Sequence, residues 1–104
     1  MPLSFEVLKS DESELVISLK GELDAVSLSN HEAQFHALLN NQNSLVILDF
    51  SEINFMASLG IRMLLIALKD LKRRGFGLKI KNPKEEVEKV FIMTGLTELL
   101  QESK

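Results

Sequence analysis

The chain has 104 residues, of which 45% are hydrophobic and 26% are charged, a composition typical of one soluble globular domain over residues 1–104. Its net charge of −3 argues against nucleic acid as a partner, and the absence of cysteine excludes disulfides and thiolate metal sites. No apolar run is long enough for membrane insertion and the first residues lack a basic signal-peptide start, so we expect a cytoplasmic protein.

Hydrophobic and polar residues alternate in two segments near the start of the chain, residues 3–8 and 15–19. This period of two predicts two strands that form a hairpin. Hydrophobic residues then recur at helical spacing over residues 26–39, and the carboxylate of Asp24 stands where it would cap the start of this helix. The polar segment 40–44 predicts a loop that ends the helix.

The central stretch of the chain combines a buried strand with a long helix. Apolar residues at 45–48 predict a strand buried on both faces, and the polar residues 49–54 predict a break after it. An apolar helix should follow over residues 58–74, with Gly75 after its end. Ser58 stands where a serine would act as the N-cap, accepting a hydrogen bond from a backbone N–H that has no other partner.

The remaining residues predict one further strand and one further helix. Alternation over residues 76–80 indicates a strand, and Asn82 followed by Pro83 is typical of an N-cap and a first helical residue. That helix should end at Gly95, while residues 96–100 fit either a short strand or a helical turn. The order of elements predicts an α/β fold, a mixed sheet of four to five strands with helices packed against it.

One side of the helix that starts at Ser58 should face away from the core. At about 100° per residue, one side of this helix should pack on the sheet, through Gly60, Leu64, Ala67, Leu68 and Leu71. The other side carries a mixture of apolar and basic residues, namely Leu59, Arg62, Leu65, Ile66 and Lys69. A solvated face seldom needs three apolar residues, so we interpret this side as a protein-docking surface. The alternative is that a neighbouring helix covers them.

The sequence gives no indication of a catalytic or metal centre. His31 and His36 fall on one predicted helix, but their spacing does not place both on one face and no carboxylate cluster accompanies them. The sequence does not indicate an acid–base pair beside Ser58, and it contains no glycine-rich phosphate loop. We therefore expect no enzymatic activity, no cofactor and no metal.

The order of these motifs resembles the STAS domain, the fold of bacterial anti-sigma factor antagonists. In that family a buried strand leads to a Met-Asp-Ser-(Ser/Thr)-Gly-Leu turn, which is matched here at Met56, Ser58, Gly60 and Ile61. Two positions depart from the pattern, Ala57 and Leu59. The upstream corner Gly21-Glu22-Leu23-Asp24 and the downstream Asn82-Pro83 and Thr94-Gly95-Leu96 also match, so the likeness covers nearly the whole chain.

This resemblance implies a partner-switching protein. Its partner would be an anti-sigma factor, usually also a serine kinase, that phosphorylates Ser58, and a phosphatase would restore the serine. Phosphorylation adds a charge of about −2, which would release the partner. Asp24 would contact the partner or a nucleotide. The expected partner-binding residues are Asp24, Ala57, Ser58, Leu59, Arg62, Leu65, Ile66 and Lys69.

A second hypothesis is a constitutive interaction subunit. STAS domains also serve as small partners of transport ATPases, without a phosphorylation cycle. Ala57 and Leu59 favour this second hypothesis, whereas Ser58 and the correctly placed Gly60 favour the switch. The sequence leaves both hypotheses open.

Overall fold

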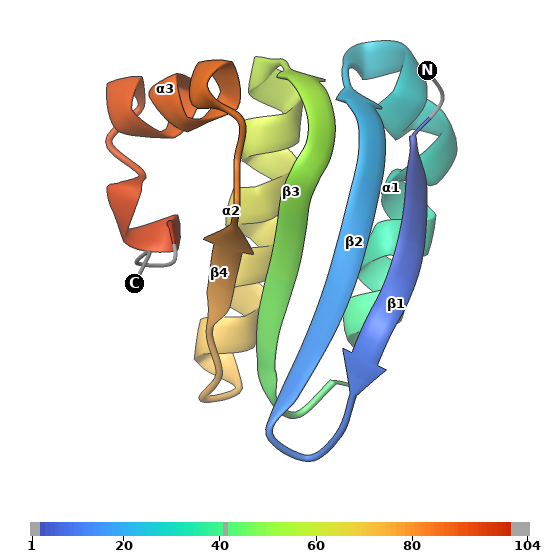
Figure 1. The fold of residues 1–104 in the computed structure, drawn as a ribbon. Coiled ribbons are helices and arrows are strands. Elements are labelled where there is room, and N and C mark those ends of the chain that lie inside the picture. Colours follow the sequence, from blue (N-terminus) through green and yellow to red (C-terminus); the bar gives the residue numbers. More distant parts are fainter. Residues whose placement is uncertain (1–2, 41, 101–104) are drawn as a thin grey trace.

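Four strands, three α-helices and a short 3₁₀ helix make up the part of the chain that the computed structural model describes, residues 3–40 and 42–100 (Figure 1). In chain order they are β1 (Ser4–Ser10), β2 (Glu14–Leu23), α1 (Ala25–Asn40), β3 (Leu45–Met56), α2 (Ser58–Arg73), β4 (Leu78–Lys81), α3 (Glu85–Met93) and the 3₁₀ helix (Thr97–Leu99). Within these residues, no helix has both the length and the apolar character needed to cross a bilayer.

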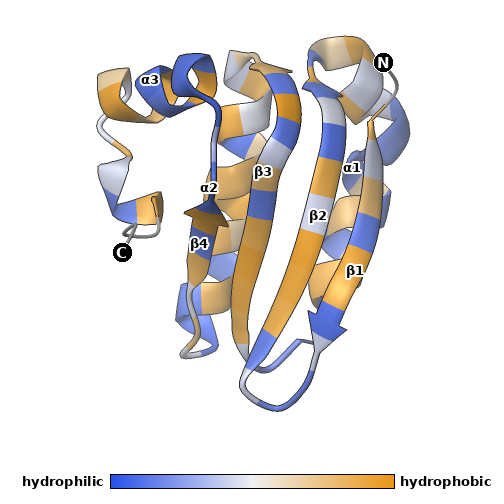
Figure 2. Cartoon of the chain, viewed as in Figure 1, coloured by the Kyte–Doolittle hydropathy of each residue, from blue (hydrophilic) through white to orange (hydrophobic). Residues whose placement is uncertain are grey.

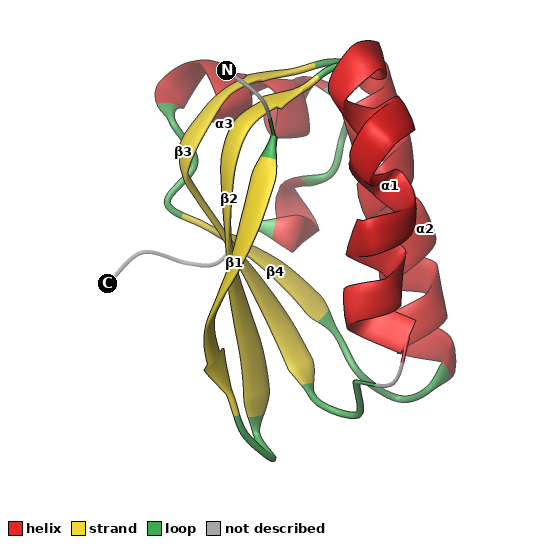
Figure 3. Ribbon diagram, turned by 90° about the vertical axis from the view of Figure 1, so that its right-hand side faces the viewer, coloured by secondary structure: helices red, strands yellow, loops and turns green. Residues whose placement is uncertain are grey.

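The four strands form one mixed sheet in the order β1-β2-β3-β4. The hairpin partners β1 and β2 are antiparallel, whereas β2 and β3, and β3 and β4, are parallel. Each parallel pair is joined by a helix, and both helices, α1 and α2, lie on the same face of the sheet (Figure 3). Two right-handed crossovers that advance in one direction give this arrangement. The predicted mixed α/β sheet is therefore confirmed.

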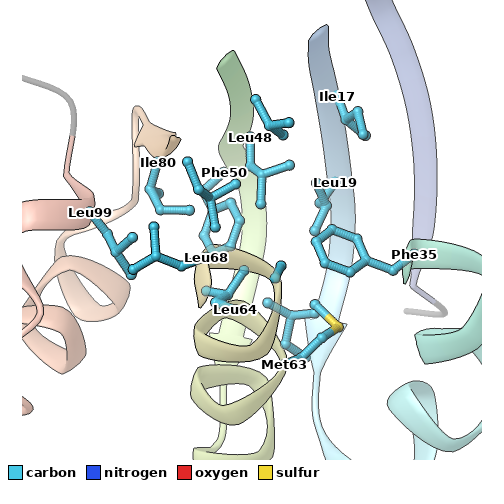
Figure 4. Packing of buried hydrophobic residues seen from close by; sticks show 14 of the residues in the cluster. Ile17, Leu19, Phe35, Leu48, Phe50, Met63, Leu64, Leu68, Ile80 and Leu99 are labelled. Atoms are coloured by element: carbon cyan, nitrogen blue, oxygen red, sulfur yellow. The ribbon is translucent and has the colours of Figure 1, made fainter. Parts of the chain in front are cut away.

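The hydrophobic core lies between the sheet and the two long helices. Leu48 and Phe50 of β3 face Leu64 and Leu68 of α2 across this layer (Figure 4). Helix α3 packs against β3, where the rings of Phe50 and Phe91 are 6.1 Å apart. The predicted core side of α2 is confirmed, because all of its residues are buried: Gly60, Leu64, Ala67, Leu68 and Leu71.

Strand β3 is longer than the sequence predicts. Residues 45–48 are mostly hydrophobic and largely buried, as expected, but the strand continues through the predicted break to Met56 (Figure 2). The prediction of a break at 49–54 was wrong because Phe50 and Ile53 are fully buried and hold this segment in the sheet. The exposed polar residues between and after them therefore belong to the strand. Pairing with β2 persists to Met56, with two register shifts.

The ends of two elements also differ from expectation. Asn82 is not an N-cap: it has a left-handed φ of 56°, Lys84 is extended, and α3 starts at Glu85. Strand β4 starts at Leu78, two residues later than predicted. The chain before it still belongs to the C-terminal cap of α2, because the Phe76 N–H donates to the carbonyl of Leu71 at 2.8 Å.

The predicted helix ends and the ambiguous segment near the C-terminus have clear outcomes. Gly75, with a φ of 92°, and Gly95 follow the ends of α2 and α3, as predicted. Residues 96–100 contain both alternatives: a 3₁₀ turn over Thr97–Leu99, and then Leu100, which pairs in parallel with Ile80.

Candidate protein-interaction site

The ends of β2 and β3, at the top of Figure 1, carry the first half of the predicted site: Asp24, Ala57, Ser58 and Leu59. The other half follows along α2: Arg62, Leu65, Ile66 and Lys69. The parallel strands β2 and β3 finish in register, with Leu23 opposite Met56, and the N–H of Ala57 donates to the carbonyl of Leu23 at 3.0 Å. One residue later each chain segment becomes a helix: α1 follows Asp24, and α2 follows Ala57. The structure therefore brings the starts of α1 and α2 to one end of the sheet.

Gly60 allows α2 to start so close to the sheet. A Cβ atom at this position would lie 2.9 Å from Cγ of Met56 and 3.0 Å from Cβ of Leu23. Both distances are shorter than ordinary van der Waals contacts, so only glycine fits without a shift of the helix or the strands. The first turn of α2 is consequently held directly against the ends of β2 and β3.

Ser58 is the first residue of α2, not its N-cap. The N-cap is Ala57, which is extended (φ −92°, ψ 173°) and whose carbonyl accepts the N–H of Gly60 at 2.9 Å. The prediction was wrong by one residue because Ala57 already makes the turn from strand to helix. The Ser58 side chain is exposed, and its hydroxyl makes no hydrogen bond to any residue in 3–40 or 42–100. It lies at the positive end of the α2 dipole.

Asp24 acts as the N-cap of α1, as its position predicted. Its Oδ1 atom accepts the backbone N–H of Ser27 at 2.9 Å, and its carbonyl accepts the N–H of Leu28. The backbone hydrogen bond from Ser27, reinforced by the Ser27 side chain, lowers the pKa of the Asp24 carboxyl. This carboxylate is therefore used within the chain, and its contact with a partner stays a prediction.

The outward side of α2 is less uniformly apolar than expected. Leu59 and Ile66 are 42% and 41% exposed, but Leu65 is half-buried and packs against the core. Arg62 and Lys69 are exposed and make no side-chain hydrogen bond or ion pair within the described residues. The surface that can meet a partner thus combines Leu59 and Ile66 with two cations.

Sequence reasoning missed two exposed apolar residues at the same end of the sheet. Val26, in the first turn of α1, is 74% exposed, and Phe55, near the end of β3, is 51% exposed. Phe55 could have been found as an aromatic residue three positions before Ser58. Val26 gives no such signal, because a valine in the first turn of an amphipathic helix can be buried or exposed.

A groove of about 380 Å³ runs between α1 and α2. Its apolar lining consists of Leu39, Ile66 and Ala67. Its polar lining consists of His36, Asn40, Lys69, Asp70 and Arg73. The sequence could not predict this groove, because it depends on how closely two helices from different parts of the chain pack.

Arg74 joins the two helices through three residues that line the groove and one that does not. Its guanidinium donates to the carbonyls of Leu39 and Asn40 at the C-terminal end of α1, at 3.0 and 3.2 Å, and to the carbonyl of Gln42 beyond the helix, at 2.6 Å. It also donates to Asp70 at 2.9 Å. Hydrogen bonds from Arg73 and then from Arg74 lower the pKa of the Asp70 carboxyl. The basic run at the end of α2 therefore links two helices, beyond the interaction with its own helix dipole that the sequence suggested.

The fold and the sequence both match known proteins. A family model described as the STAS domain matches residues 5–103. The anti-sigma-B factor antagonist of Listeria monocytogenes is 23% identical over 101 residues, which cover 97% of this chain and 89% of that protein.

Two solved structures of one protein share this fold. The anti-sigma factor antagonist SpoIIAA in its unphosphorylated form gives a TM-score of 0.80 at 24% identity, covering 97% of this chain and 89% of that one. The phosphorylated form of SpoIIAA, a Bacillus cell fate determinant, gives a TM-score of 0.69 at 24% identity, covering 97% and 92%.

Proposed function

Because this chain belongs to the STAS domain family, we propose that it is an anti-sigma factor antagonist, a cytoplasmic binding protein without enzymatic activity. The observation that carries the proposal is the exposed Ser58 at the start of α2, followed on the same helix by exposed Leu59 and Ile66. A mixed apolar and basic surface of this kind suits a protein partner. That partner is an anti-sigma factor.

We further propose that the anti-sigma factor is also a serine kinase that phosphorylates Ser58, and that a phosphatase reverses the modification. An unbonded, exposed hydroxyl is accessible to a kinase. A phosphate at this position is stabilised by the helix dipole by about 0.3–1 kcal/mol, so the fold tolerates it. The partner loses affinity because a charge of about −2 must be desolvated against Leu59 and its neighbours. A phosphorylated form is known for the relative SpoIIAA.

A constitutive interaction subunit, for example of a transport ATPase complex, is the second candidate function. The specific observation in its favour is that Ala57 and Leu59 stand where the family carries an aspartate and a second hydroxyl residue. Leu59 is 42% exposed, which makes the surface around Ser58 more apolar than the family pattern and better suited to a permanent contact. In that role Ser58 would stay unmodified.

Intact mass spectrometry distinguishes the two functions. The protein is incubated with its cognate kinase and ATP, alongside Ser58→Ala and, as a matched control, Ser51→Ala, which removes another exposed serine. We expect one phosphate on the parent and on Ser51→Ala, and none on Ser58→Ala. No mass gain on the parent, or an equal gain on all three proteins, would leave the constitutive subunit as the better function.

A binding measurement with the purified anti-sigma factor tests the switch itself. Ser58→Ala should retain binding, whereas Ser58→Asp should weaken it while the melting temperature stays within a few degrees, because an acidic residue is favourable in a first helical turn. Equal affinity of the two variants would show that charge at Ser58 does not control the partner.

A further inference from the structure

The groove between α1 and α2 lies on the same surface as Ser58 and continues away from it along the helix. Leu59, Ile66 and Arg73 are spaced seven residues apart, so they lie on one line along α2. Ile66 and Arg73 line the groove, and Leu59 precedes Ile66 by about 10 Å along the helix axis. Ser58 and the groove therefore belong to one surface that extends about four turns along α2.

The floor and walls of the groove suit an apolar side chain. Leu39 and Ala67 are 3% exposed and form its base, while Ile66, at 41%, remains open to solvent on its wall. Ala67 is small, so it leaves room above the point where the two helices meet. Exposed Ile66 beside a base of buried apolar atoms offers a surface on which an apolar side chain of another molecule can pack.

The charges around the groove are predominantly positive, although the whole chain carries −3. Lys69 lines the groove, whereas Arg62 lies outside it, seven residues earlier on the same side of α2. Neither cation has an ion-pair partner in residues 3–40 and 42–100. The one acid that lines the groove, Asp70, is already paired with both Arg73 and Arg74. On the α1 side, the carboxylate of Glu32 also has a partner within the chain, because its Oε2 lies 3.4 Å from Nε2 of His36. The cations without a partner, Lys69 and Arg62, therefore favour an acidic ligand.

We propose that the groove binds an acidic amphipathic α-helix of the partner protein, with its apolar side chains on Ile66 and Leu39 and its carboxylates toward Lys69 and Arg62. This inference rests on the proposed function, which it deepens by stating what kind of segment the partner presents. Two helices packed side by side offer a groove that a third helix fills, with anchor residues at every third or fourth position. Acidic residues flanking those anchors match the free cations.

The test uses a synthetic probe, so it does not require the natural partner. The probe is a helical peptide of about four turns, stapled on its solvent face, with leucines along one side and glutamates flanking them. A second peptide carries lysine in place of every glutamate. Amide chemical shifts of the ¹⁵N-labelled full chain are followed as each peptide is added. We expect the acidic peptide to shift amides of α1 and α2 that line the groove, at residues 36–40 and 66–73.

Charge reversal on the protein checks the mode of binding. Lys69→Glu should weaken binding of the acidic peptide about tenfold or more and strengthen binding of the lysine peptide, because residue 69 then repels nearby glutamates and attracts nearby lysines. The matched control is Lys89→Glu, the same charge change at an exposed position of α3, which should bind like the parent. The proposal is overturned if the shifts lie outside the groove, if Lys69→Glu and Lys89→Glu bind alike, or if the lysine peptide binds the parent equally well. Ser58 plays no part in this assay, so its outcome is independent of whether the switch exists.

Discussion

Gly60 is the residue on which the position of the proposed site depends most directly. Its missing side chain lets α2 begin within contact distance of Met56 and Leu23. In an exposed helix, replacement of glycine by alanine stabilises by about 1 kcal/mol, because the backbone of the unfolded chain becomes less free. Here the added methyl group collides with two strands, so the two effects oppose each other.

We expect Gly60→Ala to destabilise the protein by about 1–3 kcal/mol, the usual cost of forcing an extra carbon into a packed interior. Urea unfolding followed by circular dichroism measures this change. Gly77→Ala is the matched control, because a Cβ atom there meets only a Leu45 methyl group at an ordinary 3.6 Å. A Gly60→Ala variant as stable as Gly77→Ala would mean that α2 does not approach the sheet as closely as described.

The sequence located Ser58 correctly at the start of a helix but assigned it the wrong position within that start. Apolar periodicity from Gly60 onward identifies the helix, and this signal extends over several turns. The choice between Ala57 and Ser58 as N-cap depends on the backbone angles of one residue, which the periodicity does not determine. Serine's preference for the N-cap was outweighed here by the hydrogen bond from Ala57 to β2.

At the scale of elements, α1 and α2 are joined at one end by Arg74. The C-terminal carbonyls of a helix have no partners within it, and the guanidinium donates to two of them at the end of α1, those of Leu39 and Asn40, and to the carbonyl of Gln42 beyond the helix. The planar, forked guanidinium group can serve two helices at once, which a lysine cannot do. The packing of the groove walls therefore depends on this side chain.

We expect Arg74→Lys to lower the free energy of unfolding by about 1.5–3 kcal/mol, because carbonyls in a partly buried site lose charge-assisted hydrogen bonds. Arg73→Lys, the same change at a more exposed neighbour, should alter it by less than about 0.5 kcal/mol. Denaturant titration of both variants provides the comparison. Equal losses would contradict a special role for the Arg74 contacts.

Some elements were predictable from the chain and others depended on packing. The two hairpin strands, α1 and α2 follow from clear periods of two and of 3.6 residues. The second half of β3 did not, because its polar residues mask the two buried anchors Phe50 and Ile53. The α1–α2 groove and the reach of Arg74 to Leu39 involve contacts between residues about thirty positions apart, which local patterns do not encode.

At the scale of the whole molecule, three aspartates connect folding to pH. A hydrogen bond from the Ser13 side chain, with the backbone N–H groups of Glu14 and Ser13, lowers the pKa of Asp11 from 3.8 to about 2. The pKa values of Asp24 and Asp70 are also lowered, by Ser27 and by Arg73 respectively. Each carboxylate binds protons less readily in the folded than in the unfolded chain, so acid favours unfolding.

We expect the free energy of unfolding to be insensitive to these groups above pH 5 and to fall as the pH drops from near 3.8 to about 2, the interval between the unfolded and folded pKa values of Asp11. Urea titrations at a series of pH values measure this decline. Asp11→Asn removes one titrating group and should flatten it, whereas Glu12→Gln, beside it in the same turn, serves as the control. If the free energy of unfolding of Asp11→Asn fell with pH as steeply as that of the parent, Asp11 would not contribute to the decline.

The mixed α/β sheet and the family resemblance could be predicted from the sequence because they depend on many residues at once. An error at one boundary, as at Asn82, leaves the order of strands and helices unchanged. The surface chemistry around Ser58 depends on few residues, each of which must be placed individually. Val26, Phe55 and Leu65 illustrate this, since their exposure follows from neighbours that only the folded chain provides.

A single residue, Ala57, connects β3 to α2, and its N–H is tied to β2. A connection of one residue, held by this hydrogen bond, restricts movement of α2 relative to the sheet, so we expect a change at Ser58 to act through its charge. Phosphorylation of this serine would then change the local charge and leave the shape of the domain unchanged. Only a partner that contacts Ser58 would then change its affinity on phosphorylation, and a protein that binds elsewhere on the domain would bind both forms equally.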